Sequence, residues 1–298
     1  MKPIRTIAVI GATGRLGAPV ATELAKAFEV RAIVRSPEKA RAMLPANVEI
    51  VPGDLRDVES LRAGLQGVDA IYINLATETG DLDLDFYEER EGVANLMEAT
   101  RGLAIQYIAK IGSLGAYPPS VARIRRNAAP NLIRMQGHQI IADSGIAHTF
   151  FAPTHFMELL PTLIDKHALQ WIGNTGVSIY WISVADYARQ VANAFRNPSA
   201  MPEHCAIQGP EALTVKQAMQ QFVRDYDPTL KIRVAPLWVI RLIGLFNARM
   251  RFFGSLFAYF GDHEDPFYAA QTWQALGRPE TTLQNFARNL RATPTSLP

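Results

Sequence analysis

Residues 7–17 read Ile-Ala-Val-Ile-Gly-Ala-Thr-Gly-Arg-Leu-Gly, a short apolar run that ends in a glycine-rich turn. An amphipathic stretch, Ala18–Phe28, follows directly, and this order predicts a strand, a tight turn and a helix. The first turn of a helix has free N–H groups and a positive dipole end, which suit a pyrophosphate. Gly11 permits the turn, Gly14 lets the backbone approach phosphates, and Gly17 lets the helix pack on the strand. The stretch therefore predicts a dinucleotide site at the start of an α/β fold.

The residue after the second predicted strand bears on the choice of nucleotide. A second apolar run, Val30–Val34, lies at the distance expected for a βαβ unit and is followed by Arg35. An acid at this position favours NAD, whereas a planar guanidinium binds a 2′-phosphate. Ser36 and Lys39 add donors, and Arg15 in the turn is placed to approach a phosphate. We therefore predict NADP(H) rather than NAD(H); the alternatives are a solvated Arg35 and a glycine turn without a ligand.

The stretches Gly11–Gly17 and Val34–Ala40 together resemble the NmrA-like group of atypical short-chain dehydrogenases/reductases. The resemblance extends over residues 4–222, and a weaker similarity is present at residues 276–286. It implies that Asp54 caps the adenine edge and that Leu55 packs on the ring, although Asp54 also fits the N-cap of a short turn. Besides the three glycines and Arg15, Arg35, Ser36 and Lys39, the predicted cofactor contacts are Thr13, Leu16, Asp54, Leu55, Ala76, Arg134 and Pro153.

Short β-branched runs alternate with helical patterns through the first half of the chain. This alternation predicts a doubly wound parallel sheet, a Rossmann domain over residues 1–153. Residues 154–298 predict a smaller, partly helical substrate or lid region, interleaved with the first domain. Ligands of such sheets bind beyond the carboxyl ends of the strands, so the segments after six predicted strands should meet in one cleft. The helices expected around that cleft include 58–65, 84–100 and 131–143, and 117–130 is expected to be a long loop.

Composition narrows the class of protein. The chain has 298 residues, 48% of them apolar, and a net charge of +2, which gives no electrostatic argument for nucleic-acid binding. A single cysteine, Cys205, excludes a disulfide framework or a cysteine zinc site within one chain, and we expect no metal. The apolar run near the N-terminus is too short for a signal peptide, and we expect a cytoplasmic protein.

The proton relay of the short-chain dehydrogenases is incomplete in this sequence. Those enzymes use a Tyr four residues before a Lys, with a Ser nearby. Ser113 follows the fifth predicted strand and fits the Ser, but no Tyr here has a Lys four residues on. Aligned on Ser144-Gly145, the family's Lys falls at Arg134, and the residue four before it is Pro130. Arginine does not donate a proton near neutrality, so the relay is not intact.

Three interpretations remain open at this point. In the first, Arg134 replaces the ribose-binding lysine, and His138, Tyr117 or water supplies the proton. In the second, hydride passes to a quinone or another conjugated acceptor that takes its proton from solvent. In the third, the site only senses the nucleotide and the protein acts through a partner; the NmrA-like group contains members of the last two kinds. A histidine on a helix is more often a packing residue than a catalyst, which applies to His138.

The stretch Pro153-Thr154-His155-Phe156-Met157-Glu158 follows the sixth predicted strand. In the resembled family this loop lines the nicotinamide, which makes His155 the titratable residue best placed near the reactive ring. Further on, Ser183 and Thr214 are predicted to cap helices.

Residues 234–260 are rich in aromatic side chains, and their only charges are Arg241, Arg249 and Arg251. No window there is long and charge-free enough to span a bilayer. The segment fits a core helix pair, a lid over an apolar substrate pocket, a homodimer interface or a helix lying on a membrane. If it is a lid, the substrate is an apolar small molecule. A further possibility, that the protein assembles into a membrane-associated complex, depends on the same residues alone.

Overall fold

The computed structural model describes residues 2–77, 81, 83–124, 127–262, 264 and 266–293. Its largest element is a seven-stranded parallel sheet with the strand order β10-β6-β5-β4-β1-β2-β3. The strands are β1 (Thr6–Ile10), β2 (Glu29–Val34), β3 (Val48–Pro52), β4 (Ala70–Ile73), β5 (Tyr107–Ile111), β6 (Ala147–Pro153) and β10 (His204–Ile207). This order confirms the predicted doubly wound α/β fold.

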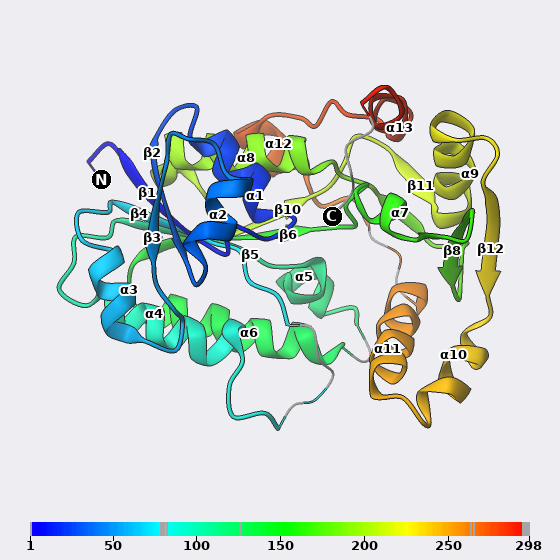
Figure 1. Cartoon of the computed structure of the whole chain (residues 1–298), viewed down its shortest axis with the longest axis horizontal. Coiled ribbons are helices and arrows are strands. Elements are labelled where there is room, and N and C mark those ends of the chain that lie inside the picture. Colours follow the sequence, from blue (N-terminus) through cyan, green and yellow to red (C-terminus); the bar gives the residue numbers. More distant parts are fainter. Residues whose placement is uncertain are drawn as a thin grey trace.

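Helices cover both faces of this sheet (Figure 1). One face carries α1 (Gly17–Leu24), α2 (Pro37–Met43), α8 (Val184–Arg196) and α12 (Ala270–Leu276). The other face carries α3 (Val58–Gly64), α4 (Val93–Thr100) and α6 (Ala129–Asp143). Because both faces are covered, the central strands are apolar throughout, and β5 is buried along its whole length.

The strand order reverses between β1 and β4, and the glycine turn lies at this point. Gly11 directly follows β1 with φ of +77°, a conformation that favours glycine. A Cβ on Gly11 would lie 1.9 Å from the backbone oxygen of Asn74, the residue that follows β4. The turn is therefore held between the carboxyl ends of the two central strands, where ligands of open α/β sheets bind.

Several predicted boundaries need correction. The helix expected over 84–100 begins at Glu88 with a π-helical turn, Glu88–Gly92, that continues into α4. The loop expected at 117–130 contains a short helix, α5 (Pro118–Val121), after a 3₁₀ turn at Leu114–Ala116; its residues 125 and 126 lie outside the described residues. The strand β10 was not predicted. It belongs to the part of the chain after residue 153, but it pairs with β6 in the main sheet. Ser36 precedes α2 but makes no capping hydrogen bond.

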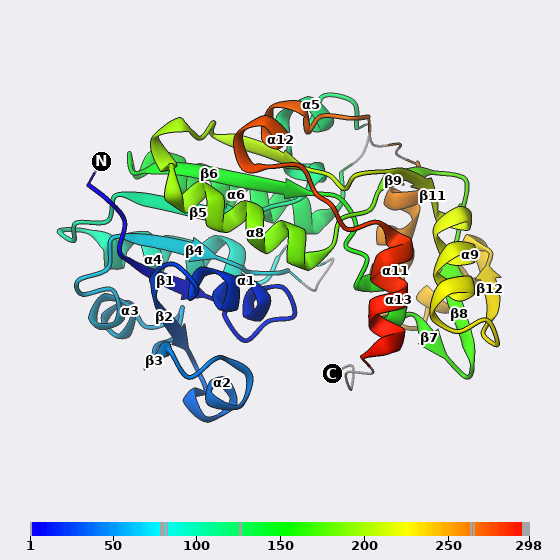
Figure 2. The same ribbon diagram turned by 90° about the horizontal axis from the view of Figure 1, so that it is seen from above.

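A smaller region with its own core lies beyond the carboxyl side of the sheet (Figure 2). It contains the three-stranded sheet β12-β8-β7 and the two-stranded sheet β11-β9. Its elements are α7 (Leu159–Thr162), β7 (Ile164–Asp165), β8 (Ala168–Ile172), β9 (Ser178–Tyr180), β11 (Ala212–Thr214), α9 (Val215–Tyr226), β12 (Lys231–Ala235), α10 (Leu237–Gly244), α11 (Ala248–Asp262) and α13 (Leu283–Ala292). A further 3₁₀ turn spans Pro198–Ala200.

The two predicted caps are confirmed. The Ser183 side chain accepts a hydrogen bond from the backbone N–H of Asp186 at the start of α8. Thr214 forms a capping box with Gln217 at the start of α9. The first cap lies where the chain returns from β9 to the main sheet, and the second lies where it continues from β11 into α9 of the smaller region.

Candidate functional site

The glycine turn has the close packing that its spacing predicts. A Cβ on Gly17 would lie 2.1 Å from the Gly11 backbone oxygen, so only glycine lets α1 start this close to β1. The Gly14 N–H donates to the same Gly11 oxygen over 3.1 Å, which closes the turn. Thr13 is partly exposed, and the partly buried Leu16 packs against the core beside it. The turn thus presents an open backbone surface at the start of α1, which fits a pyrophosphate.

Arg35 lies exposed directly after β2, beside a surface hollow of about 480 Å³. Residues of β3, of the β3–α3 connection and of α3 line the rest of this hollow, among them Asp54, Asp57 and Ser60. Ser36 and Lys39 are exposed beside Arg35. Within the described part of the chain, no carboxylate pairs with Arg35 or Lys39. An unpaired guanidinium at the rim of a hollow fits an adenosine with a 2′-phosphate.

The residues expected around the adenine make specific local contacts. Asp54 accepts a hydrogen bond from the Arg56 N–H over 2.8 Å, so its role in a short turn is confirmed. Asp57, rather than Asp54, is the N-cap of α3. The Leu55 backbone oxygen accepts from Asn95 over 2.8 Å, which anchors the loop to α4. Whether Asp54 and Leu55 also contact adenine stays a prediction.

The remaining predicted cofactor contacts lie at or just after the carboxyl ends of strands in the main sheet. Ala76 is exposed beyond β4, Pro153 is buried at the end of β6, and Arg15 is exposed in the glycine turn. All three are at the carboxyl edge of the sheet, because each follows or ends a parallel strand.

Ser113 belongs to a short hydrogen-bond chain at the end of β5. Its Oγ donates to Asn131 Oδ1 over 2.7 Å, and Asn131 Nδ2 donates to Asn127 Oδ1 over 2.8 Å. Asn127 Nδ2 in turn donates to the Gly115 backbone oxygen over 2.6 Å. The chain fixes the Ser113 hydroxyl against α6, and the sequence reasoning missed Asn131, which lies between Pro130 and Arg134.

Arg134 is held by a buried ion triad that the sequence reasoning also missed. Its Nε and Nη2 donate to Glu89 Oε1 over 2.9 and 2.8 Å, and its Nη1 donates to Asn131 Oδ1 over 3.2 Å. Glu89 also binds Lys110, and both side chains are fully buried. Burial lowers the pKa of Lys110, while Glu89 opposes that shift. A guanidinium has five N–H donors, so Arg134 keeps two for a ligand.

The candidate proton donors differ in their surroundings. His138 is buried, with its ring stacked on Phe150 at 4.0 Å, and burial holds its pKa well below the ordinary value. His155 lies between Trp181 at 5.6 Å and Phe260 at 4.5 Å, and burial lowers its pKa to about 4. Both imidazoles are therefore neutral at physiological pH.

Tyr117 occupies a different position, at the start of α5. Its ring contacts Tyr268 at 5.3 Å and His204 at 6.3 Å. Burial raises its pKa, so no lowered-pKa phenol like that of the Tyr/Lys pair is present at this position. Among the five predicted catalytic residues, Ser113 and Arg134 both donate to Asn131. Tyr117 and His138 both have ring contacts with His204, at 6.3 and 6.5 Å.

Helix α11 brings aromatic side chains to the carboxyl edge of the sheet. Phe260 contacts His155, and a Cβ on Gly115 would lie 2.5 Å from the Tyr259 hydroxyl. Asn174 Nδ2 donates to the Gly261 backbone oxygen over 3.0 Å, and Phe257 packs on Trp171. The end of α11 therefore places aromatic side chains beside His155 and Gly115.

Glu158 is a titratable group at the start of α8 whose role is structural. Its Oε1 accepts from the Val184 N–H over 2.9 Å at the start of α8, and its Oε2 is buried without a hydrogen-bond partner among the described residues. Burial raises its pKa from 4.5 to about 7, and the nearby Asp186 adds to the rise.

This raised pKa makes a prediction about pH. Because the folded state holds the Glu158 proton more tightly than the unfolded state, stability falls as pH rises from 4.5 to about 7. Glu158→Gln keeps the acceptor and removes the charge, so it should be more stable than the wild type above neutrality, by about 2 kcal/mol. Urea unfolding at about pH 5 and about pH 8 measures the difference; an equal difference at both pH values would contradict the assignment.

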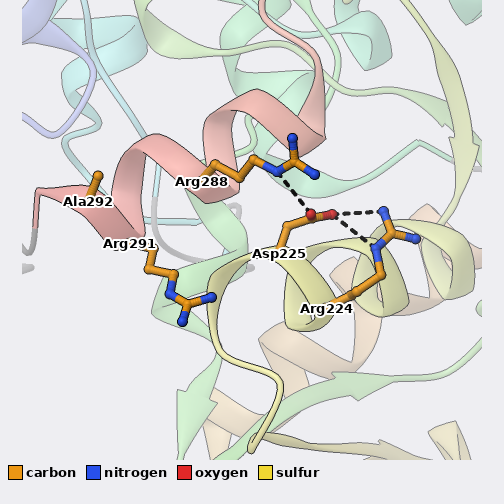
Figure 3. A pocket seen from close by; sticks show the side chains of 5 residues that line it. All are labelled: Arg224, Asp225, Arg288, Arg291 and Ala292. Carbon is orange, nitrogen blue, oxygen red and sulfur yellow. Dashed lines mark hydrogen bonds and ion pairs between the residues drawn. The ribbon is translucent and has the colours of Figure 1, made fainter.

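A second hollow, of about 500 Å³, lies between α9 and α13 (Figure 3). Asp225 in it binds Arg224 over 2.7 Å and Arg288 over 3.1 Å, and Arg291 lies beside them. These ion pairs join the C-terminal helix to the smaller region. The residues that line this hollow belong to α9 and α13, and none of them follows a strand of the main sheet. We therefore assign the hollow a structural role.

The amino-acid sequence of this chain matches a known protein family and several known proteins. A sequence model described as NAD(P)H-binding matches residues 11–198, which include the glycine turn and most of the main sheet. The chain belongs to this NAD(P)H-binding family. The NAD(P)H azoreductase of Xenophilus azovorans is 29% identical over 214 residues, covering 70% of this chain and 69% of that protein.

Other relatives include both an assembly factor and an oxidoreductase. The photosystem II assembly factor Ycf39 of Trieres chinensis is 30% identical over 248 residues, 80% of this chain and 74% of that protein. An NmrA-like family domain-containing oxidoreductase, notA' of Aspergillus versicolor, is 46% identical over 74 residues, 24% of this chain and 21% of that protein. The NmrA-like resemblance is thereby confirmed.

The fold has close counterparts among solved structures. The NADPH-dependent quinone oxidoreductase QOR2 of Escherichia coli, in complex with NADPH, superposes with a TM-score of 0.72. It is 22% identical, and the match covers 95% of this chain and 99% of that one. At this identity the likeness shows the shared fold.

The described residues contain no group of three or more His, Cys, Asp or Glu placed to hold a metal ion. No described helix is long and apolar enough to cross a membrane.

Proposed function

We propose that this protein is an NADPH-dependent reductase of an apolar, quinone-like acceptor. The observation that carries the proposal is the pairing of a complete nucleotide turn with a site whose candidate proton donors are neutral. A carbonyl needs a proton from the enzyme as it accepts hydride, whereas a quinone is reduced to a hydroquinone anion that takes its proton from water. Such an acceptor suits a site with Ser113 and without the Tyr/Lys pair.

The residues divide into cofactor and acceptor contacts. The turn at Gly11–Gly17 binds the pyrophosphate, and Arg35, with Ser36 and Lys39, binds the 2′-phosphate. The two N–H groups that Arg134 keeps free hold the nicotinamide ribose. Bound NADPH would supply hydride to the acceptor. The Ser113 hydroxyl, which donates to Asn131 Oδ1 in this structure, would turn to donate to the acceptor oxygen instead.

The acceptor class follows from the aromatic side chains at the end of α11. Phe260 and Tyr259 place aromatic surface beside His155 and Gly115. Such a surface favours a flat apolar molecule over a sugar or an acid. The names of two similar proteins, an azoreductase and a quinone oxidoreductase with the same fold, indicate conjugated acceptors, and this supports the choice.

A panel of acceptors tests the proposal. Oxidation of NADPH, followed by the absorbance of the reduced nicotinamide, should proceed with naphthoquinones and be at least about 100-fold slower with aliphatic aldehydes. Equal rates with both classes would mean that a protein acid operates and would contradict the proposal.

Ser113 and Asn131 make a further prediction for this reaction. Ser113→Ala removes the donor to the acceptor oxygen and should lower kcat with a quinone about tenfold, with KM for NADPH unchanged. Asn131→Ala leaves Ser113 without its fixed partner and should have a smaller effect of the same kind. Ser120→Ala, in α5 and outside this hydrogen-bond chain, is the matched control; an equal loss in the control would mean that the effect is not specific.

The second candidate function is a nucleotide-dependent regulatory or assembly protein without turnover. The missing Tyr/Lys pair and the relation to an assembly factor favour it. A protein of this kind binds NADP⁺ and NADPH, forms a stable complex with its partner and reduces no acceptor. The acceptor panel therefore separates the two candidates.

A further inference from the structure

Helix α10 carries an exposed apolar face, which lies at the far end of the smaller region from the main sheet (Figure 1). Trp238, Leu242, Leu245 and Phe246 are 66, 56, 68 and 90% exposed. Their spacing of three to four residues places the first three on one side of the helix. We call these four residues the α10 face. Large apolar side chains gathered in this way mark a contact surface.

The opposite side of α10 packs on α11 and holds the face outward. Gly244 is buried, and a Cβ there would lie 3.0 Å from the Arg251 Cα, so the two helices cross closely at this glycine. Ile240 is buried on the same side. The exposed face is therefore a consequence of a fixed helical hairpin.

The charges around the face are all of one sign. From Pro228 to Gly261 the sequence contains no Asp or Glu, but it contains Lys231, Arg233, Arg241, Arg249 and Arg251. Lys231, Arg233, Arg241 and Arg251 are exposed, and none of the four forms an ion pair within the described part of the chain. Arg241 lies in the same helical register as the α10 face, one turn after Trp238.

We infer that the α10 face docks on an anionic lipid surface. Apolar side chains ringed by basic ones match a bilayer interface, where acyl chains and negative headgroups lie in adjacent layers. Tryptophan is enriched at that level. A second copy of this chain fits poorly, because two such faces would bring arginines against arginines without any acid to pair them.

Docking of this kind would connect the membrane to the site through one helix. Helix α11 begins two residues after Phe246 and ends beside His155. The inference stands on the exposed face and its charges alone, and it holds whether or not the protein turns over an acceptor.

Flotation of the full chain with vesicles tests this inference. Vesicles of phosphatidylcholine with roughly 30 mol% phosphatidylserine should bind the protein at least about tenfold more tightly than phosphatidylcholine alone, and added salt should weaken the binding. Trp238→Ser combined with Phe246→Ser should lower binding by about 100-fold. Met43→Ser, which changes a comparably exposed apolar residue in α2, is the matched control and should bind as the wild type does.

A second readout locates the contact. Trp171 and Trp181 are buried and Trp273 is partly buried, so brominated lipids should quench mainly Trp238, and Trp238→Phe should remove that quenching. NADPH binding by each variant shows that it has folded. Failure of the wild type to bind anionic vesicles, or equal binding by the double variant, would overturn the inference. A concentration-dependent dimer that the double variant loses would also overturn it, because the face would then be a protein interface.

Discussion

Glu89→Gln should destabilise the protein by about 3 kcal/mol, because it leaves the buried Lys110 and the partly buried Arg134 facing a neutral amide. Glu89 is the only carboxylate that the structure gives to Lys110 and Arg134 in the described residues, and Glu89 and Lys110 are fully buried. Gly137 makes this arrangement possible, since a Cβ there would lie 1.9 Å from the Glu89 backbone oxygen. The cost should shrink at high pH, because burial already lowers the pKa of Lys110 and its neutral form becomes available.

Urea unfolding at several pH values measures this effect. The matched control combines Glu89→Gln with Lys110→Met, which removes one of the two stranded cations and should recover part of the loss. A loss below about 1 kcal/mol for the single variant would show that the triad contributes little to stability.

Arg35→Asp should weaken NADPH binding by about 100-fold, while NADH binding changes little or improves. The substitution removes a charged donor to the 2′-phosphate and introduces a carboxylate that repels it but accepts from ribose hydroxyls. Calorimetric titration of both nucleotides measures the two affinities. Arg41→Asp makes the same charge change on an exposed residue of α2 and is the control.

The comparison with the control decides the interpretation of Arg35. Equal losses of NADPH affinity in both variants would mean that the general charge of the surface, rather than a specific contact, favours the phosphate. Equal losses for NADPH and NADH would mean that Arg35 does not contact the 2′-phosphate.

Much of the fold could be predicted because local patterns determine it. The run before Gly11, the arginine after β2 and the caps at Ser183 and Thr214 each act within a few residues, and the structure has them as predicted. The strand β10 could not be predicted in this way, because four residues, His204–Ile207, become a strand only by pairing with β6. The π-helical turn before α4 contains Glu89, whose partners Lys110 and Arg134 are distant in the sequence, so no local pattern relates them.

The candidate site was predicted less completely, since its geometry depends on contacts between distant segments. Ser113 could be placed from the end of its strand, but its partner Asn131 is fixed by the packing of α6. One signal was available for the ion triad: Lys110 stands in a strand predicted to be buried on both faces, and a buried lysine requires a carboxylate. The contact between His155 and Phe260 joins segments that no local pattern relates.

The most direct test of the proposed function is a single turnover. The purified protein, saturated with NADPH and with no flavin or metal added, would be mixed with a naphthoquinone without oxygen. The account predicts loss of NADPH and formation of one hydroquinone for each NADPH, far faster than the same mixture reacts without protein. A complex that binds NADPH firmly and leaves it unoxidised would contradict the account and favour a regulatory or assembly role.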